Sequence, residues 1–142
     1  MAEISLRKAR TIIRKALEKG RELDLKPLSV VVLDAGGHVL AFEREDGAAP
    51  GRFAIAQGKA FGAVMLGMGG AAQMARAEQQ AYFMNAVNGV YGGKVIPVPG
   101  GILVRDKRDN IIGAIGVTGD TSDNDAEAGL AGIAAAGLTG EA

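Results

Sequence analysis

The chain has few side chains that could bind a ligand or move a proton, and its only imidazole is His38. His38 follows Asp34-Ala35-Gly36-Gly37, which predicts a turn because glycine reaches backbone angles that strain other residues. A single histidine excludes zinc sites that need two or three imidazoles. It also leaves Ser5, Ser29 and Ser122 without the surroundings of a Ser-His-Asp triad. His38 is therefore a candidate ligand-binding residue, with local hydrogen bonding in a surface turn as the alternative.

Two basic residues are the best candidates for binding an anion. Lys59 lies in Gly58-Lys59-Ala60, and Arg44 ends a predicted strand. A cationic side chain beside glycine N–H groups suits a carboxylate. Lys59 could also transfer a proton, which makes it the candidate catalytic residue. For Arg44 the alternative is an ion pair with Glu43 or Asp46.

Three further groups of residues have both a binding and a structural interpretation. After Pro99, Gly100 and Gly101 could present backbone N–H groups to a ligand or only form a turn. An acidic group lacks the spacing of a calcium loop and indicates helix capping or a weak surface metal site. It consists of Asp120, Asp123, Asp125 and Glu127. An apolar group could line a slot for a planar ligand or pack in a core or interface. It consists of Met68, Met74, Tyr82, Phe83 and Met84.

The elements that must position these residues follow from hydrophobic spacing and β-branched runs. Their order is helix, strand, strand, helix, a short helix, three strands and a helix, which predicts an α+β fold with an antiparallel sheet. The segment 82–94 is expected to be a loop because it holds three glycines, and 95–98 at best an edge strand because of Pro97. Ser5 is expected to cap the first helix, and Ser122 or Asp120 the last. The helices are expected at 4–23, 52–69, 71–80 and 123–136, and the remaining strands at 28–34, 39–44, 102–105 and 111–118.

Composition narrows the class of protein. A chain of 142 residues is expected to form one domain, residues 1–142. Its 16 basic and 16 acidic side chains balance, which argues against nucleic acid as a partner. The absence of cysteine excludes disulfides, thiolate metal sites and cysteine nucleophiles. Charges or glycines interrupt every apolar stretch and no targeting segment is visible, so we expect a cytoplasmic protein with no membrane partner.

Several segments together resemble the GlcG/HbpS family, whose members include haem-binding or haem-degrading proteins and the C-terminal domain of PduO-type proteins. The segments occur in the family's order over nearly the whole chain. They are 31–42 with Arg44 and 46–48, Gly58-Lys59-Ala60, Pro97 with Pro99-Gly100-Gly101, 112–119 and 125–129.

The resemblance implies a profilin-like fold, with a sheet of about five antiparallel strands flanked by helices. In PduO-type relatives the matching histidine can bind haem iron, so His38 is implied as an axial ligand, a role that suits a neutral imidazole. The resemblance also implies a homo-oligomer, an octamer or a tetramer. The Gly- and Ala-rich helices at 52–69 and 123–136 offer flat surfaces for packing between copies.

Three hypotheses of function follow. The first is a small-ligand-binding oligomer that holds haem or another small carboxylated compound through the candidate residues His38, Arg44, Lys59, Gly100 and Gly101. The second is a cofactor-independent enzyme of organic-acid or aromatic catabolism, with isomerase or decarboxylase acid/base chemistry at Lys59. The third is a non-catalytic assembly partner within a catabolic system. Haem uptake would favour the first, and turnover lost on Lys59→Ala would favour the second.

Overall fold

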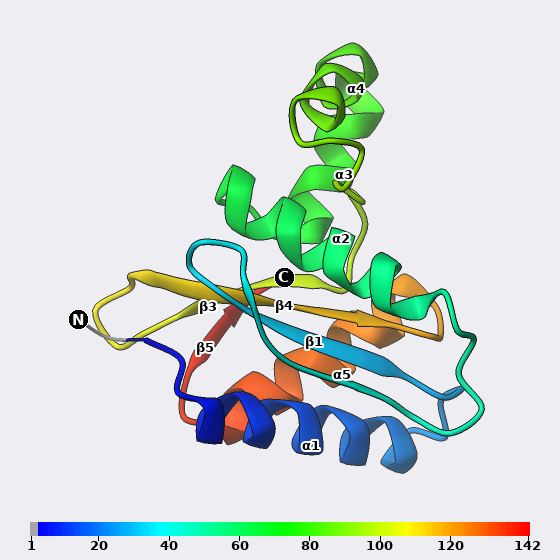
Figure 1. Cartoon of the computed structure of the whole chain (residues 1–142), viewed down its shortest axis with the longest axis vertical. Helices are drawn as coiled ribbons and strands as arrows, with labels where there is room; N and C mark the ends of the chain where they lie inside the picture. The colour runs from blue at the N-terminus through cyan, green and yellow to red at the C-terminus, as the bar shows by residue number, and fades with distance from the viewer. Residues whose placement is uncertain (1–2) are drawn as a thin grey trace.

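The computed structural model describes residues 3–142, and within them it contains five α-helices and five β-strands. The helices are α1 (Leu6–Glu22), α2 (Arg52–Leu66), α3 (Gly70–Gln79), α4 (Ala81–Val90) and α5 (Ser122–Ala135). The strands are β1 (Ser29–Asp34), β2 (Val39–Arg44), β3 (Gly101–Arg105), β4 (Ile111–Thr118) and β5 (Thr139–Glu141). The predicted α+β class and antiparallel sheet are confirmed (Figure 1). No helix within residues 3–142 is long and apolar enough to cross a bilayer.

The strands form one antiparallel sheet in the order β2-β1-β4-β3-β5. The two predicted hairpins, β1 with β2 and β3 with β4, build most of it, and β1 pairs with β4 to join them. Asp34 at the end of β1 pairs with Gly113 near the start of β4. The β1–β2 turn and the β3–β4 turn therefore lie at the same end of the sheet, which is called the turn end below.

Helices cover both faces of the sheet (Figure 1). On one face α1 and α5 enclose the larger core, to which Ile12 and Ile13 of α1 contribute fully buried side chains. The predicted helical spacing of α1 is confirmed, and the Ser5 hydroxyl caps it by accepting from the Lys8 N–H at 3.1 Å. On the other face α2 encloses a smaller core through Ala56 and Ala60. The sheet is thus a rigid layer that fixes the relative positions of its two ends.

The segment 82–94, expected to be a loop, contains all of α4 except its first residue, so that expectation is wrong. Of its three glycines only Gly89 lies inside the helix. Gly92 and Gly93 follow the helix with φ of 68° and 77°, values that suit the chain reversal after a helix end. Two of the glycines therefore terminate the helix rather than prevent it.

The expected edge strand at 95–98 is also wrong. This segment runs along α2 instead, where the Ile96 N–H donates to the Gly58 carbonyl at 3.2 Å. Gly58 permits this approach because a Cβ there would lie 2.6 Å from the Lys94 carbonyl oxygen. The sheet edge beside β3 is occupied by β5, which the sequence did not predict.

The structure also corrects two smaller expectations, one for the cap of α5 and one for the surfaces of α2 and α5. The cap of α5 is Thr121 rather than Ser122 or Asp120, and its hydroxyl accepts from the Asn124 N–H at 3.2 Å. The small residues of α2 and α5 pack inside the chain, as Gly132 does against the backbone of α1. The surfaces expected to be flat contacts between copies are therefore largely used within one copy.

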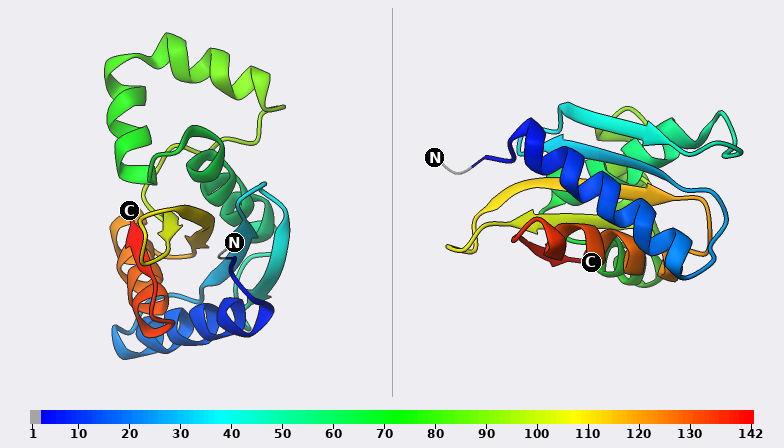
Figure 2. Two further views of the ribbon diagram at one scale, coloured as in Figure 1. Left: turned by 90° about the vertical axis from the view of Figure 1, so that its left-hand side faces the viewer. Right: turned by 90° about the horizontal axis from the view of Figure 1, so that it is seen from below.

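The helices α3 and α4 form an arm that stands away from the sheet (Figure 2, left). Each is ten residues long, and α4 packs chiefly on α3. Gly70, Gln73 and Met84 are the only buried residues of the two helices. Most of the arm therefore faces solvent in a single copy of the chain.

Candidate functional site

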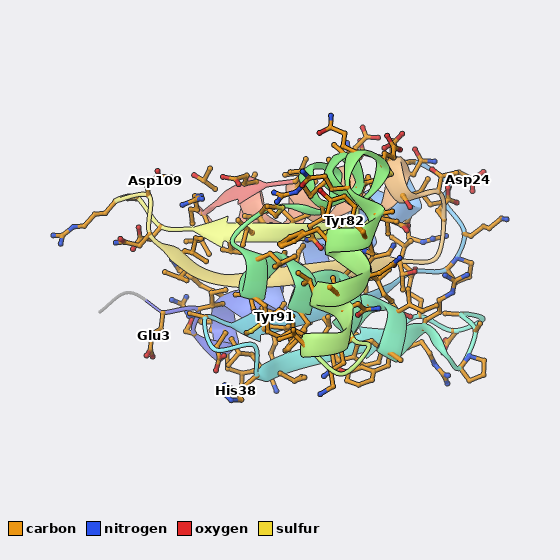
Figure 3. All side chains as sticks on the ribbon, turned by 90° about the horizontal axis from the view of Figure 1, so that it is seen from above. Glu3, Asp24, His38, Tyr82, Tyr91 and Asp109 are labelled. Atoms are coloured by element: carbon orange, nitrogen blue, oxygen red, sulfur yellow. The ribbon has the colours of Figure 1, made fainter. Side chains whose placement is uncertain are left out.

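A groove of about 940 Å³ lies at the turn end of the sheet. Its walls come from the β1–β2 turn, the β3–β4 turn, the start of α1 and the residues just after α5. Figure 3 shows Glu3, His38 and Asp109 at this end of the molecule and Asp24 at the other. The groove's apolar lining is formed by Ile4, Leu40, Ile111, Ile112 and Leu138.

His38 lies at the groove with its side chain 81% exposed. The predicted turn that holds it is confirmed, and Gly37 there has a φ of 85°. The Asp34 carboxylate accepts from the N–H groups of Gly36 and His38, each at 2.9 Å, and its Oδ1 lies 3.2 Å from His38 Nδ1. In the tautomer that carries its hydrogen on Nδ1, the ring is oriented by this carboxylate and Nε2 keeps a free lone pair.

The carboxylate of Asp34 remains ionised to a lower pH than an ordinary aspartate. Partial burial acts to raise its pKa, but the hydrogen bonds from His38 and Gly36 outweigh burial and lower the pKa below its usual value. Asp106 in the other turn is similar, because the hydrogen bond from the Asn110 backbone lowers its pKa. The carboxylates of Asp34 and Asp106 thus stabilise their own turns by accepting from backbone N–H groups, and neither forms an ion pair with a side chain of another helix or strand.

Three of the groove's charged side chains that lack an ion pair are positive, and Glu3 adds one negative charge. Lys8 comes from α1, and Lys107 and Arg108 come from the β3–β4 turn. Within residues 3–142 none of these three side chains forms an ion pair. A groove with apolar walls, available cations and one exposed imidazole suits an apolar ligand that carries carboxylates.

Lys59 lies elsewhere, at the opposite end of the sheet, and is 3% exposed. Its Nζ donates to the Val117 carbonyl at 2.9 Å and to Asp125 Oδ2 at 3.1 Å. The other oxygen of Asp125 accepts from the Asp120 N–H at 2.9 Å. This buried ion pair joins α2, β4 and α5.

Burial dominates the protonation of this pair. It lowers the pKa of Lys59, although the attraction of Asp125 acts in the opposite direction. It also raises the pKa of Asp125, against the hydrogen bond from Asp120 and the charge of Lys59. The loss of hydration therefore outweighs the attraction between the two groups, as is common for buried ion pairs.

The structure brings together some of the predicted site residues and separates others. Gly100 and Gly101 pack against Lys59, and a Cβ on Gly100 would lie 3.0 Å from Lys59 Nζ. Arg44 ends β2, six residues after His38 and thus about 20 Å away along an extended strand. It lines a separate groove of about 420 Å³ and forms no ion pair within the described residues. The predicted site is therefore divided among three places.

Sequence reasoning missed both the partner of Lys59 and the cations of the groove. Asp125 had been grouped with the acidic cap residues, but Ala128 and Gly129, three and four residues later on the same helix face, are a signal that it faces the interior. Lys107 and Arg108 occupy a predicted hairpin tip, where only the fold shows that His38 lies at the same end. Within residues 3–142, no three acidic or histidine side chains gather in a way that could hold a metal ion.

Comparison with known proteins identifies related structures. The model of the family described as "Haem degrading protein HbpS-like" matches residues 4–134. No curated protein matches the chain. A crystal structure of a PduOC:heme complex has a TM-score of 0.87 at 22% identity, over 99% of this chain and 100% of that one. A double mutant of HbpS from Streptomyces reticuli has a TM-score of 0.80 at 28% identity, over 94% and 87%. Protein ORFY from Klebsiella pneumoniae has a TM-score of 0.83 at 23% identity, over 96% and 93%.

Proposed function

The chain belongs to the HbpS-like family, and on that premise we propose that it binds haem in the groove at the turn end of the sheet. The observation that carries the proposal is the position of the only imidazole of the chain. His38 lies at this groove, exposed, with its Nδ1 beside the Asp34 carboxylate and its Nε2 free to bind iron. A related crystal structure is that of a PduOC:heme complex, which supports the choice of ligand.

The other residues of the groove fit the remaining parts of a haem. The apolar side chains of Leu40 and Ile112 would contact the macrocycle. Lys8, Lys107 and Arg108 would bind the two propionate carboxylates. When bound, haem supplies a redox-active iron, while the protein orients the ring and tunes its ligand through the carboxylate behind the imidazole.

Haem titration of the purified protein tests the proposal. We expect stoichiometric uptake with a Soret band that shifts or disappears in His38→Ala, while the far-ultraviolet circular dichroism stays unchanged. Lys107→Ala together with Arg108→Ala should weaken binding without moving the band, because these cations contact the carboxylates and not the iron. Arg14→Ala, an exposed cation on α1 outside this groove, is the matched control.

Each failure has a separate meaning. An unchanged spectrum in His38→Ala would exclude imidazole ligation. Failure of the wild-type protein to take up haem would refute haem as the ligand. The first alternative would then be another small carboxylated compound in the same groove, to be identified by mass spectrometry of the native protein.

The second predicted function, an enzyme using Lys59, has one favourable observation, the pKa of Lys59 that burial lowers. A lysine 3% exposed and paired with Asp125 is poorly placed to reach a substrate, however. We therefore assign Lys59, Gly100 and Gly101 a supporting role beneath α2. Arg44 stays a predicted anion-binding residue of a separate surface groove.

Self-association is part of the proposal. The expected assembly is an octamer or a tetramer of identical chains, which the family resemblance implies and which closed symmetry permits. Light scattering at micromolar concentration should give a mass well above the 14.5 kDa of one chain. A mass equal to that of one chain would refute the expected assembly without affecting the haem titration.

A further inference from the structure

A row of polar side chains crosses three neighbouring strands at the end of the sheet opposite the turn end. Ser29 of β1 pairs with Arg44 of β2 on one side and with Thr118 of β4 on the other. Residues paired in this way have side chains on the same face, with Cβ atoms about 4.5–5.5 Å apart. Arg44, Ser29 and Thr118 therefore form one continuous row, although they are far apart in the sequence.

The row lies on the face of the sheet that α2 covers. Val31, two residues after Ser29, is buried in the smaller core beneath α2, and strand residues two apart share a face. The backbone of α2 lies directly on Gly116, two residues before Thr118. Arg52, the first residue of α2, donates from its Nη1 to the Thr118 hydroxyl at 2.9 Å. The row therefore lies beneath the first turn of α2.

One hydroxyl of the row is buried without a partner. The Oγ of Ser29 is fully buried and has no hydrogen-bond partner among residues 3–142. A buried polar group without a hydrogen bond destabilises the folded protein, so native structures usually supply a partner for it. The Thr118 hydroxyl beside it accepts from Arg52, which leaves its own hydrogen available as a donor. Both hydroxyls are thus suited to donate to an external oxygen atom.

The charge around the row favours an anion. Within residues 3–142 neither Arg44, which is exposed, nor Arg52, which is half-buried, forms an ion pair. The first turn of α2 has no acidic residue, and its N-cap, Gly51, has no side chain that accepts from the first N–H groups. A helix N-terminus attracts negative charge, so a cation at the first position is unfavourable there. An anion would satisfy the arginines and the helix terminus together.

The acidic side chains closest in sequence leave this positive charge unpaired. Three of them accept hydrogen bonds from groups outside the row, namely Glu45, Asp120 and Asp125. Glu43 lines the groove beside α1. Asp46, in the loop after β2, forms no ion pair within the described residues.

We propose that this row and the first turn of α2 form a binding site for a small oxyanion, the carboxylate or phosphate group of a ligand. The guanidinium groups of Arg44 and Arg52 supply the charge, which suits either group. The hydroxyls of Ser29 and Thr118 and the free N–H groups of α2 supply neutral donors. The site lies at the opposite end of the sheet from the groove at the turn end. It depends neither on haem nor on self-association.

Thermal unfolding of the full-length protein in rising concentrations of phosphate or of acetate tests the site, with ionic strength held constant by sodium chloride. A ligand that binds only the folded state raises the midpoint along a saturation curve, from which the Kd follows. The general effect of salts on protein stability acts equally on the wild type and its variants, so the comparison between them isolates the site. The anion with the lower Kd identifies the group that the site prefers.

Variants separate a binding role from a structural one. Arg52→Gln should raise the Kd about 10-fold or more, because it removes a charged donor, and the double variant with Arg44→Gln should abolish the saturable rise. Ser29→Ala should also raise the Kd, yet without anion it should unfold at the same or a higher temperature than the wild type, since it removes an unpartnered hydroxyl. Arg14→Gln, an exposed cation on α1, is the matched control and should keep the wild-type Kd.

Two results would overturn the site. The first is a wild-type protein whose midpoint shows no saturable rise with either anion, or a rise that the double arginine variant retains in full. The second is a Ser29→Ala variant that unfolds at a lower temperature without anion and keeps the wild-type Kd, because the hydroxyl would then serve the fold alone.

Discussion

Replacement of Lys59 by methionine is expected to lower the free energy of unfolding by about 3–5 kcal/mol, because it leaves one member of a buried ion pair without its partner. Asp125 is 1% exposed and would lose the 3.1 Å bond from Lys59 Nζ. Methionine keeps most of the length of the lysine side chain, so little of the cost comes from a cavity. The loss should shrink as the pH falls, because protonation of Asp125, whose pKa burial already raises, removes the unpaired charge.

The double variant Lys59→Met with Asp125→Leu is expected to behave differently. The pKa of Lys59 is lowered and that of Asp125 is raised, so in both groups burial disfavours the charged form more than the pair favours it. Removing both charges should therefore recover most of the lost stability, and comparable replacements have been neutral or stabilising by about 1–4 kcal/mol. The unpaired Asp120 N–H, which loses its bond to Asp125, subtracts about 1 kcal/mol from that recovery.

Urea unfolding of the wild type, Lys59→Met, Asp125→Leu and the double variant at pH 7 measures this cycle. The protein concentration is held fixed because the proposed assembly would add to stability. The exposed pair of Lys15 and Glu18, with a similar N–O distance of 3.0 Å, is the matched control. Lys15→Met should cost at most about 1 kcal/mol. Additive effects of the two buried substitutions, or a cost of Lys59→Met as small as that of Lys15→Met, would refute the interpretation of the pair as a buried support.

Two further predictions concern the turns that join the elements. Gly37→Val should destabilise the folded protein by about 1–2 kcal/mol in thermal unfolding, because Gly37 has a φ of 85°. Gly51→Ala should be nearly neutral, because Gly51 has ordinary backbone angles and no neighbour within 4 Å of an added Cβ. Equal effects of the two substitutions would contradict the role of the turn. Asp120 has its pKa lowered from 3.8 to about 2, chiefly by the Asn124 side chain, so its stabilising contribution is complete above pH 3.8 and is lost as the pH falls through about 2. Asp120→Asn should therefore show a weaker pH dependence of unfolding over that range than the wild type, and an unchanged dependence would exclude this contribution.

The parts of the fold that local sequence determines were predictable. The spacing of buried residues in α1 and the β-branched runs of β1 and β4 each report burial directly, since these elements pack against the core along most of their length. The turn at Gly37 was predictable for the same reason, because its backbone angle depends on the residue itself. The position of His38 in that turn therefore followed from sequence alone.

The remaining features depend on contacts between distant segments. The sequence identified Lys59 as a free cation because nothing near it is acidic, whereas its partner Asp125 lies 66 residues away. The helix predicted at 71–80 is confirmed as α3, whereas α4 was missed because its pattern reflects no core within this chain. β5 was missed because a strand of three residues carries too short a pattern to distinguish it from the chain end, and its position is set by pairing with β3.

The separation of the groove from the buried ion pair lets one small protein carry both the proposed ligand site and a pair of charges that is costly to bury. Ile112 of β4 lines the groove, and Val117 of the same strand accepts from Lys59, about 17 Å further along at strand spacing. Gly116, whose missing side chain lets the backbone of α2 at Ala56 lie directly on the strand, brings Lys59 within reach of that carbonyl. The pair thus fixes α2 and α5 on the sheet at one end, so the exposed turns at the other end can carry free cations and an exposed imidazole without being needed to hold the core together.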